Sequence, residues 1–208
     1  MKRGIFITLE GPEGAGKSTQ GKKLAAWLKR RGRKVLFTRE PGGTATGQKL
    51  RNVLLDPRSR DIDPFVELCL YEAGRAILVR QVIAPALKAG KVVIVDRFQD
   101  STWVYQGYAG GMDRRIVEAI GHLAMGKTQP DLTILLDLPV KVGLRRVTRP
   151  NRFEAKPLAF HEKVRAGYRY LARRERRFRL IRADQPAGKV QQQIQKAVAD
   201  VLEKYRRA

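Results

Sequence analysis

A glycine-rich run near the start of the chain has the residue types and spacing of a phosphate-binding site. Residues 11–19, called the phosphate loop below, read Gly-Pro-Glu-Gly-Ala-Gly-Lys-Ser-Thr and fit the pattern G-x-x-x-x-G-K-[S/T]. Its glycines let the backbone turn its N–H groups inward, which makes a nest for phosphate oxygens. Lys17 can reach the β- and γ-phosphates of a nucleotide, and the Ser18 hydroxyl suits one coordination position of Mg²⁺. The run therefore predicts binding of a nucleoside triphosphate.

Charged residues follow two other apolar stretches. Val35–Thr38 leads into Arg-Glu-Pro-Gly-Gly-Thr at 39–44, and Lys91–Asp96 ends in a carboxylate that is followed by Arg97. Open α/β sheets bind their ligands at the carboxyl ends of parallel strands. Asp96 is therefore a candidate for holding Mg²⁺ or its bound water, and Arg97 for facing a phosphate. Taken alone, the loop at 39–44 also fits a plain turn with an ion pair.

Two more stretches could complete such a site. Residues 100–108 mix hydrogen-bonding and aromatic side chains, and stacking with amide pairing can read a nucleobase. Residues 148–157 are bounded by two prolines and are flanked by arginines. Guanidinium groups on a mobile lid can close on transferring phosphates. The arginines around this segment are Arg145, Arg146, Arg149 and Arg152.

The hydrophobic pattern predicts the elements that would position these residues. A strand at 5–10, a helix at 20–31 and a strand at 35–38 form a βαβ unit, so these strands should be parallel. At 208 residues, the chain is expected to form one α/β domain over 1–208. Further strands are expected at 91–96, 132–137 and 178–181. Further helices are expected at 46–55, at 64–89 with a kink at Pro85, and at 113–125, 140–147, 158–174 and 187–205.

Cysteine usage and hydropathy exclude some classes of protein. The single cysteine, Cys69, rules out a disulfide framework and favours a reducing compartment. It lies in an apolar stretch without a basic neighbour, so we interpret it as a buried small hydrophobic residue. No apolar run approaches the roughly 18 residues that span a bilayer, and the start of the chain does not resemble a signal peptide. We therefore expect a cytoplasmic protein without a membrane partner.

The chain is strongly basic, with 43 Lys and Arg residues against 20 Asp and Glu and a net charge of +23. This balance suits polyanionic substrates, and it also suits nucleic acid. The basic residues at 165–177 lie among apolar ones at helical spacing, which favours a solvated helix face over phosphate steering or a nucleic-acid surface. The two histidines, His122 and His161, are too few for a metal cluster, and we interpret His161 as a surface or helix-packing residue.

These residues describe a small phosphotransferase, and its acceptor can be partly inferred. A hydroxyl acceptor benefits from a carboxylate base, whereas a phosphate acceptor is already anionic and needs cationic clamps. Four arginines near strand ends or in the helices that follow them favour the phosphate acceptor: Arg39, Arg51, Arg75 and Arg97. Glu13 and Glu40 keep open the alternative of a deoxynucleoside kinase. The net charge of +23 keeps open the alternative of a basic P-loop ATPase that binds nucleic acid, although we do not expect nucleic acid to be a partner.

Five stretches together resemble one family, the bacterial thymidylate kinases, which are P-loop nucleoside monophosphate kinases. They are residues 11–19, Thr38-Arg-Glu-Pro-Gly-Gly-Thr44, Asp96-Arg-Phe98 with Ser101 and Thr102, Tyr105-Gln-Gly107, and Arg152-Phe-Glu154. The resemblance implies a three-layer P-loop NTPase fold, with about five parallel strands flanked by helices and a short lid at about 148–157. It also implies a homodimer that transfers the γ-phosphoryl group of Mg-ATP to dTMP to give dTDP.

The resemblance implies roles for individual residues. Those that would bind ATP are Gly11, Glu13, Gly14, Ala15, Gly16, Lys17, Ser18 and Thr19, with Ser18 and Asp96 at Mg²⁺. Those that would bind dTMP are Glu13, Arg39, Glu40, Pro41, Arg51, Tyr71, Arg75, Arg97, Thr102, Tyr105 and Gln106. Those that would act in catalysis are Lys17, Arg97, Arg149, Arg152 and Glu13. Among these, Arg75 and Gln106 would read thymine, and Tyr105 would crowd out a 2′-hydroxyl.

The chain departs from the family pattern at three places. Tyr71 stands where relatives usually have a stacking Phe. Gly14 stands where one branch has an arginine, so the transition-state cation would come from the lid, from Arg149 or Arg152. Asn151 stands where many relatives have Asp, which removes a carboxylate from the lid.

Overall fold

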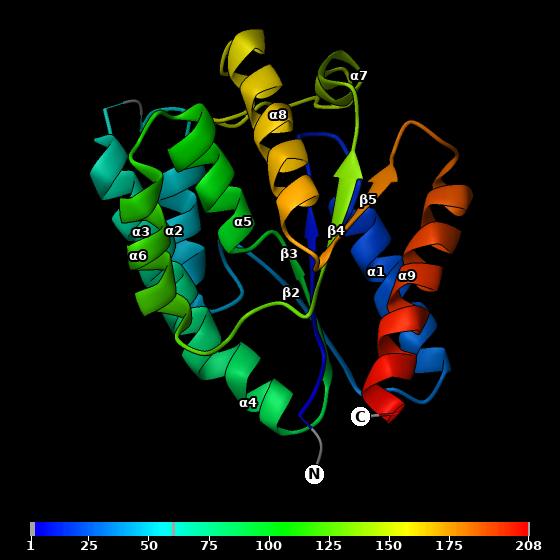
Figure 1. Ribbon diagram of the computed structural model, residues 1–208. Coiled ribbons are helices and arrows are strands. Elements are labelled where there is room, and N and C mark those ends of the chain that lie inside the picture. Colours follow the sequence, from blue (N-terminus) through cyan, green and yellow to red (C-terminus); the bar gives the residue numbers. More distant parts are fainter. Residues whose placement is uncertain (1–2, 60, 208) are drawn as a thin grey trace.

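A parallel β-sheet lies at the centre of the molecule, with helices packed on both of its faces (Figure 1). The computed structural model describes residues 3–59 and 61–207. Its five strands lie in the order β2-β3-β1-β4-β5 and all neighbours are parallel, as expected from the sequence. The strands are β1 (Phe6–Glu10), β2 (Val35–Arg39), β3 (Val92–Asp96), β4 (Leu132–Asp137) and β5 (Phe178–Arg182).

The three central strands are mainly hydrophobic because helices cover both of their faces. Every residue of β1, β3 and β4 is buried, whereas the edge strands β2 and β5 are partly exposed. Inside β1 and β4, the hydroxyls of Thr8 and Thr133 hydrogen-bond each other at 2.9 Å. Polar residues otherwise gather at the strand ends, and parallel strands bring these ends to one edge of the sheet.

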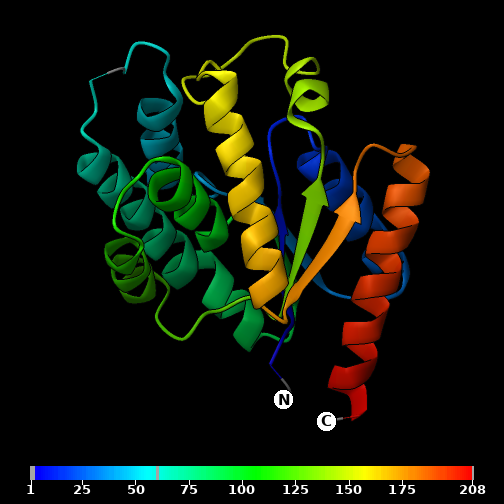
Figure 2. The ribbon, with the colours of Figure 1, turned by 45° about the horizontal axis from the view of Figure 1, so that its top comes forward.

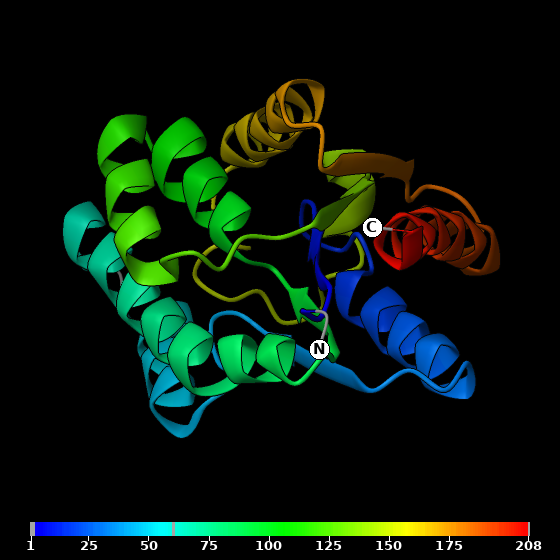
Figure 3. The ribbon, with the colours of Figure 1, turned by 60° about the horizontal axis from the view of Figure 1, so that its bottom comes forward.

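The helices form one layer on each face of the sheet (Figure 3). α1 (Lys17–Arg30) and α9 (Ala187–Arg207) cover one face, where Leu28 and Ile194 belong to one hydrophobic cluster. α3 (Pro64–Leu78) and α8 (Leu158–Arg174) lie on the other side, and α2 (Ala45–Leu55) and α6 (Arg114–Met125) pack against α3. Within 3–59 and 61–207, no helix is long and apolar enough to cross a membrane.

The long helix expected at 64–89 is interrupted near its end. α3 runs into a π-helical turn, η1 (Val79–Ile83), which continues as the short helix α4 (Ala84–Lys88). Pro85 lies in the first turn of α4, close to the kink that was predicted. Because proline lacks an N–H group, the regular hydrogen-bond ladder cannot pass through it, and the wider π turn absorbs the break.

Two other segments differ from their predicted form. The aromatic and amide-rich stretch is helical, with α5 (Gln99–Thr102) followed by the π-helix η2 (Trp103–Ala109). The helix expected at 140–147 is shorter, since α7 covers only Val140–Leu144. Its continuation forms turns that lead into residues 145–157, which pass over the carboxyl edge of the sheet to α8 (Figure 2). Both differences place irregular or π-helical backbone beside the predicted site.

The interpretation of Cys69 as a buried residue is wrong, because its thiol lies on the exposed face of α3. The same helix buries Leu68 and Arg75, which lie on the side that faces the protein interior. An apolar neighbourhood in sequence does not determine which face of a helix a residue occupies. His161 is buried in α8, where its ring packs edge-to-face on Phe160 at 5.7 Å, so the helix-packing interpretation fits.

Candidate active site

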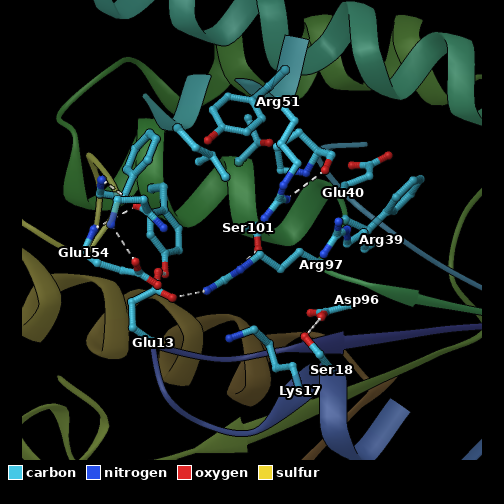
Figure 4. Close-up of a pocket in the computed structure, with 18 of the residues that line it drawn as sticks. Glu13, Lys17, Ser18, Arg39, Glu40, Arg51, Asp96, Arg97, Ser101 and Glu154 are labelled. Atoms are coloured by element: carbon cyan, nitrogen blue, oxygen red, sulfur yellow. Dashed lines mark hydrogen bonds and ion pairs between the residues drawn. The ribbon is translucent and has the colours of Figure 1, made fainter. Parts of the chain in front are cut away.

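A cavity of about 310 Å³ opens at the carboxyl edge of the sheet and collects most of the predicted site residues. Those that line it are Glu13, Gly14, Gly16, Lys17, Ser18, Thr19, Arg39, Glu40, Pro41, Arg51, Tyr71, Arg75, Asp96, Arg97, Thr102, Tyr105 and Gln106. Gly11, Ala15, Arg149 and Arg152 are not among the lining residues. Figure 4 shows the phosphate loop at the bottom of this cavity and three arginines across from it.

The phosphate loop turns at its glycines, as the motif requires. Gly11, Gly14 and Gly16 all have positive φ, at 142°, 67° and 85°, and α1 begins directly afterwards at Lys17. The Lys17 ammonium donates to the carbonyls of Gly11 and Pro12 at 3.0 and 2.8 Å. Burial, together with the nearby charge of Arg97, lowers the pKa of Lys17 to about 8. The loop therefore presents N–H groups and one cation to the cavity.

Helix α7 packs directly on the phosphate loop. A Cβ atom added to Gly143 would lie 2.1 Å from the Glu13 carbonyl oxygen, and one added to Gly14 would lie 2.2 Å from the Gly143 oxygen. Arg146, which follows α7, donates from Nη1 to the Gly14 carbonyl at 3.0 Å. The two glycines thus permit backbone contact between loop and helix, and a side chain at position 14 would have no room.

Two oxygen-bearing side chains meet beside the loop. The Ser18 hydroxyl, from the first turn of α1, donates to the carboxylate of Asp96, at the end of β3. Across the described parts of the chain, no group of three or more His, Cys, Asp and Glu side chains could hold a metal ion. A hydroxyl and a carboxylate without further protein ligands suit Mg²⁺, which usually keeps waters and phosphate oxygens as its other ligands.

Arg97 joins the phosphate loop to the opposite wall of the cavity. Its φ of 68° is the only positive value at a non-glycine residue among those described, which turns the side chain back toward the loop. Its Nη2 donates to Glu13 Oε2 at 2.9 Å, and its Nη1 donates to the hydroxyls of Ser101 and Tyr168 at 3.2 and 3.0 Å. Tyr105 donates to the other Glu13 oxygen at 2.6 Å.

Glu13 is held as an anion by this arrangement. Burial alone would raise the pKa of Glu13, but the charges of Arg97 and Lys17 outweigh it and lower the pKa to about 2. Two more cations reach the same side of the cavity, because Arg39 ends β2 and Arg51 projects from α2 (Figure 4). Arg51 is fixed by donating to the Pro41 carbonyl at 2.9 Å. The result is a cluster of three guanidinium groups facing the phosphate loop.

Arg75, expected to read a base together with Gln106, is engaged by the protein itself. Its Nε donates to Glu40 at 2.8 Å, its Nη2 donates to Thr102 at 2.9 Å, and its Nη1 forms an ion pair with Glu72 at 2.6 Å. Burial raises the pKa of Glu40 to about 7, although the Arg75 charge opposes this. Because all three guanidinium nitrogens are occupied, Gln106 is the freer of the two groups to contact a ligand.

Arg152 does not reach toward the phosphate loop. Its Nη2 pairs with Glu67 on α3 at 2.5 Å, its Nε donates to the Leu54 carbonyl at 3.0 Å, and its guanidinium stacks 4.7 Å over the Phe153 ring. The neighbouring lid residue, Asn151, accepts from the backbone N–H groups of Phe153 and Glu154 at 2.8 and 3.1 Å. The asparagine oxygen therefore closes this lid turn without a carboxylate at position 151.

Glu67 is not among the residues predicted from the sequence, yet it connects two that are. Its carboxylate accepts from Gln106 at one oxygen and pairs with Arg152 at the other. Glu67, Tyr71 and Arg75 lie four residues apart, so they share one face of α3. That spacing indicates Glu67, because Tyr71 and Arg75, at the next two positions on the same helix face, are both predicted site residues.

Comparisons with known proteins point to one family. The family model for thymidylate kinase matches residues 9–194. The chain is 50% identical to a thymidylate kinase of Desulfosudis oleivorans over 197 residues, covering 89% of this chain and 92% of that protein. It is 45% identical to one of Deinococcus radiodurans over 204 residues, covering 96% and 98%. The crystal structure of thymidylate kinase from Ehrlichia chaffeensis is similar, with a TM-score of 0.78, 31% identity, and coverage of 94% and 99%.

Proposed function

The chain belongs to the thymidylate kinase family, and we propose that it transfers the γ-phosphoryl group of Mg-ATP to dTMP, which yields dTDP for dTTP synthesis. The family resemblance seen in the sequence motifs is thereby confirmed, and so is the expected P-loop NTPase fold. One observation carries the functional proposal. The phosphate loop and the arginine cluster, two groups that are each suited to a phosphate, face each other across a single cavity.

On the donor side, the phosphate loop would hold the triphosphate of ATP. Its N–H groups and Lys17 would bind the β- and γ-phosphates, where negative charge develops during transfer. Ser18 and Asp96 would hold Mg²⁺, directly or through a water molecule, because they supply paired oxygens next to Lys17. When bound, the ion neutralises charge between the β- and γ-phosphates.

On the acceptor side, the arginine cluster would hold the monophosphate of dTMP. Arg97, Arg39 and Arg51 would offset the repulsion between two anionic groups and keep the acceptor oxygen in line with the donor. Glu13 would face the 3′-hydroxyl of the sugar. Tyr105, which is fixed on Glu13, would close the space that a 2′-hydroxyl needs.

The lid would supply a further cation during transfer. Arg149 is the candidate for this role, because Arg152 is already held by Glu67 and by the Leu54 carbonyl. Arg146 donates to the Gly14 carbonyl of the phosphate loop, so a movement at this end of the lid would also move the loop. Arg152 does not line the cavity, and we assign it to the attachment of the lid to α3 through Glu67.

A deoxynucleoside kinase is the second candidate, since it needs a carboxylate base near a hydroxyl acceptor. Glu13 is unsuited to that work, because a pKa of about 2 makes it a weak base at neutral pH. Glu40 is directed into its pair with Arg75. A coupled ADP-release assay with dTMP, dUMP, dCMP, dGMP and thymidine decides between the two. We expect dTMP to give the largest kcat/KM; preferred turnover of thymidine would replace the proposal.

We propose that the enzyme is a homodimer that pairs through α3 and α6. Large apolar side chains are exposed on these two helices, which pack against each other. They are Phe65, Val66, Ile116 and Leu123, the last being 78% exposed. Together with the exposed Cys69, they form an apolar face that a second copy would cover.

A further inference from the structure

Glu67, on α3, connects Gln106 in the lining of the cavity to Arg152 in the lid. Its side chain is largely buried, and its two carboxylate oxygens serve different partners. Oε1 accepts from the Gln106 amide nitrogen at 2.8 Å, and Oε2 accepts from Arg152 Nη2 at 2.5 Å. Because Gln106 comes from η2 and Arg152 from the lid, one carboxylate ties three parts of the chain together.

The contact with Glu67 determines which end of the Gln106 amide faces the cavity. A carboxylate paired with a guanidinium group can only accept hydrogen bonds, so the Gln106 NH₂ group must point to it. Gln106 is itself a lining residue of the cavity. Its carbonyl oxygen is therefore the end left for a ligand, and that oxygen can only accept.

We propose that Glu67 sets the base specificity of the acceptor site by fixing this amide. A base whose ring nitrogen carries hydrogen, as in thymine or uracil, can donate to the Gln106 oxygen. Cytosine presents a bare ring nitrogen at the same position, which would face the oxygen lone pairs without a hydrogen between them. The inference rests on the proposed function, and it assigns Glu67 a positioning role rather than a catalytic one.

The proposal can be tested by reversing the direction of the hydrogen bond between Gln106 and residue 67, so that Gln106 accepts instead of donating. Glu67→Gln keeps the shape of the side chain, but replaces two accepting oxygens by one oxygen that accepts and one NH₂ group that donates. Arg152 can only donate, so the new amide oxygen must turn to Arg152 and its NH₂ group must turn to Gln106. Gln106 then has to offer its oxygen to residue 67 and its NH₂ group to the cavity, which favours cytosine.

The experiment measures kcat/KM for dTMP and dCMP at saturating Mg-ATP, and the Kd of both nucleotides without ATP. We expect E67Q to lower the dTMP:dCMP ratio by at least ~10-fold, as expected when a buried polar group changes its partner. The control is Glu118→Gln, the same substitution at an exposed carboxylate of α6 that accepts from Trp103, the first residue of η2. Its ratio should stay within about twofold of wild type.

A double-mutant cycle with Gln106→Leu shows whether E67Q changes the dTMP:dCMP ratio by turning the Gln106 amide or by disordering the site as a whole. Q106L alone should remove most of the preference for dTMP, and adding E67Q to it should leave the ratio unchanged. The inference is overturned if folded E67Q keeps the wild-type ratio, or if E67Q shifts the ratio equally in the Q106L background. It is also overturned if Q106L retains full discrimination, whether or not E67Q folds. A wild-type enzyme that does not favour dTMP would instead overturn the proposed function.

Discussion

In the proposed donor site Lys17 would supply a cation, and its surroundings lower the pKa of its ammonium group. Burial and the charge of Arg97 lower the pKa of Lys17 to about 8 when no phosphate is bound. A lysine with a lowered pKa is protonated below that value and loses its proton as pH rises through it. Phosphate binding would favour the charged form, so nucleotide affinity and the protonation of Lys17 are linked.

We therefore predict that ATP binding weakens above about pH 8, by up to about tenfold per pH unit. The measurement is the Kd of ATP by calorimetry between about pH 7 and about pH 9.5. Lys17→Arg is the control, because a guanidinium group stays charged over this range and should give a flat profile. An equally steep alkaline loss in K17R would show that another group is responsible.

Removing the charge altogether gives a second prediction. Lys17→Ala should lower kcat by about 10²- to 10³-fold, because the lost interaction is strongest where charge develops in the transition state. The fold should persist, since both hydrogen bonds that the ammonium donates within the described residues go to carbonyls of its own loop, Gly11 and Pro12. Turnover by rapid quench and a circular-dichroism melt are the two readouts. Near-normal turnover in a folded K17A would remove Lys17 from the catalytic machinery.

The positions of single residues can be predicted where a sequence motif fixes them. They are harder to predict where the packing of helices determines which side chains pair. The phosphate loop, Asp96 and Arg97 lie together as their positions at strand ends indicated. The sequence did not reveal that Arg75 is occupied by Glu40 and Glu72, because such pairing depends on how α3 packs. The sequence predicts Arg152 near the transferring phosphate, but in the structure its guanidinium pairs with Glu67 outside the lining of the cavity.

At the scale of elements, the contact between α7 and the phosphate loop brings two backbone segments together beside the site. Helix and loop meet through backbone atoms at Gly143, where a Cβ would lie 2.1 Å from the Glu13 carbonyl oxygen. Backbone cannot move aside as the end of a flexible side chain can. Any side chain at position 143 must therefore displace the loop, the helix or both.

Gly143→Ala should destabilise the protein by about 1–3 kcal/mol and raise the KM values for both nucleotides, since Glu13 and Gly14 lie in the displaced segment. Thermal unfolding and steady-state kinetics measure the two effects. Gly188→Ala is the matched control, because nothing lies within 4 Å of its added Cβ in α9. It should be neutral or stabilise by up to about 1 kcal/mol. Equal behaviour of the two variants would contradict the proposed contact.

Elements with a continuous apolar run were predicted well. The strands at 91–96 and 132–137 were placed within one residue, because a buried parallel strand needs unbroken hydrophobic sequence. The helix predicted at 140–147 is too long, because the chain leaves α7 after Leu144 in turns beside the phosphate loop. The π turns η1 and η2 were not predicted, because the same residues could continue an α-helix locally.

At the scale of the whole molecule, the net charge of +23 will attract polyanions whatever the enzyme does. We predict that DNA binds weakly and that affinity falls steeply between 50 and 200 mM salt, as expected for binding to phosphates alone. DNA should not stimulate ATP hydrolysis. Fluorescence anisotropy with labelled DNA and an ATPase assay measure the two quantities. Salt-insensitive binding combined with stimulated hydrolysis would revive the alternative of a nucleic-acid-dependent ATPase.

The apolar face on α3 and α6 gives the remaining prediction for the whole molecule. Exposed hydrophobic side chains gathered on two neighbouring helices favour a second copy as partner, because symmetric pairing buries the same face twice. Leu123→Glu would place a charge at the most exposed of them, so it should convert a dimer into a monomer of 23.5 kDa in light scattering. Leu180→Glu is the control, since Leu180 is also exposed, at 45%, but lies on the edge strand β5. The assignment of the interface fails if L123E remains dimeric, or if L180E dissociates as readily.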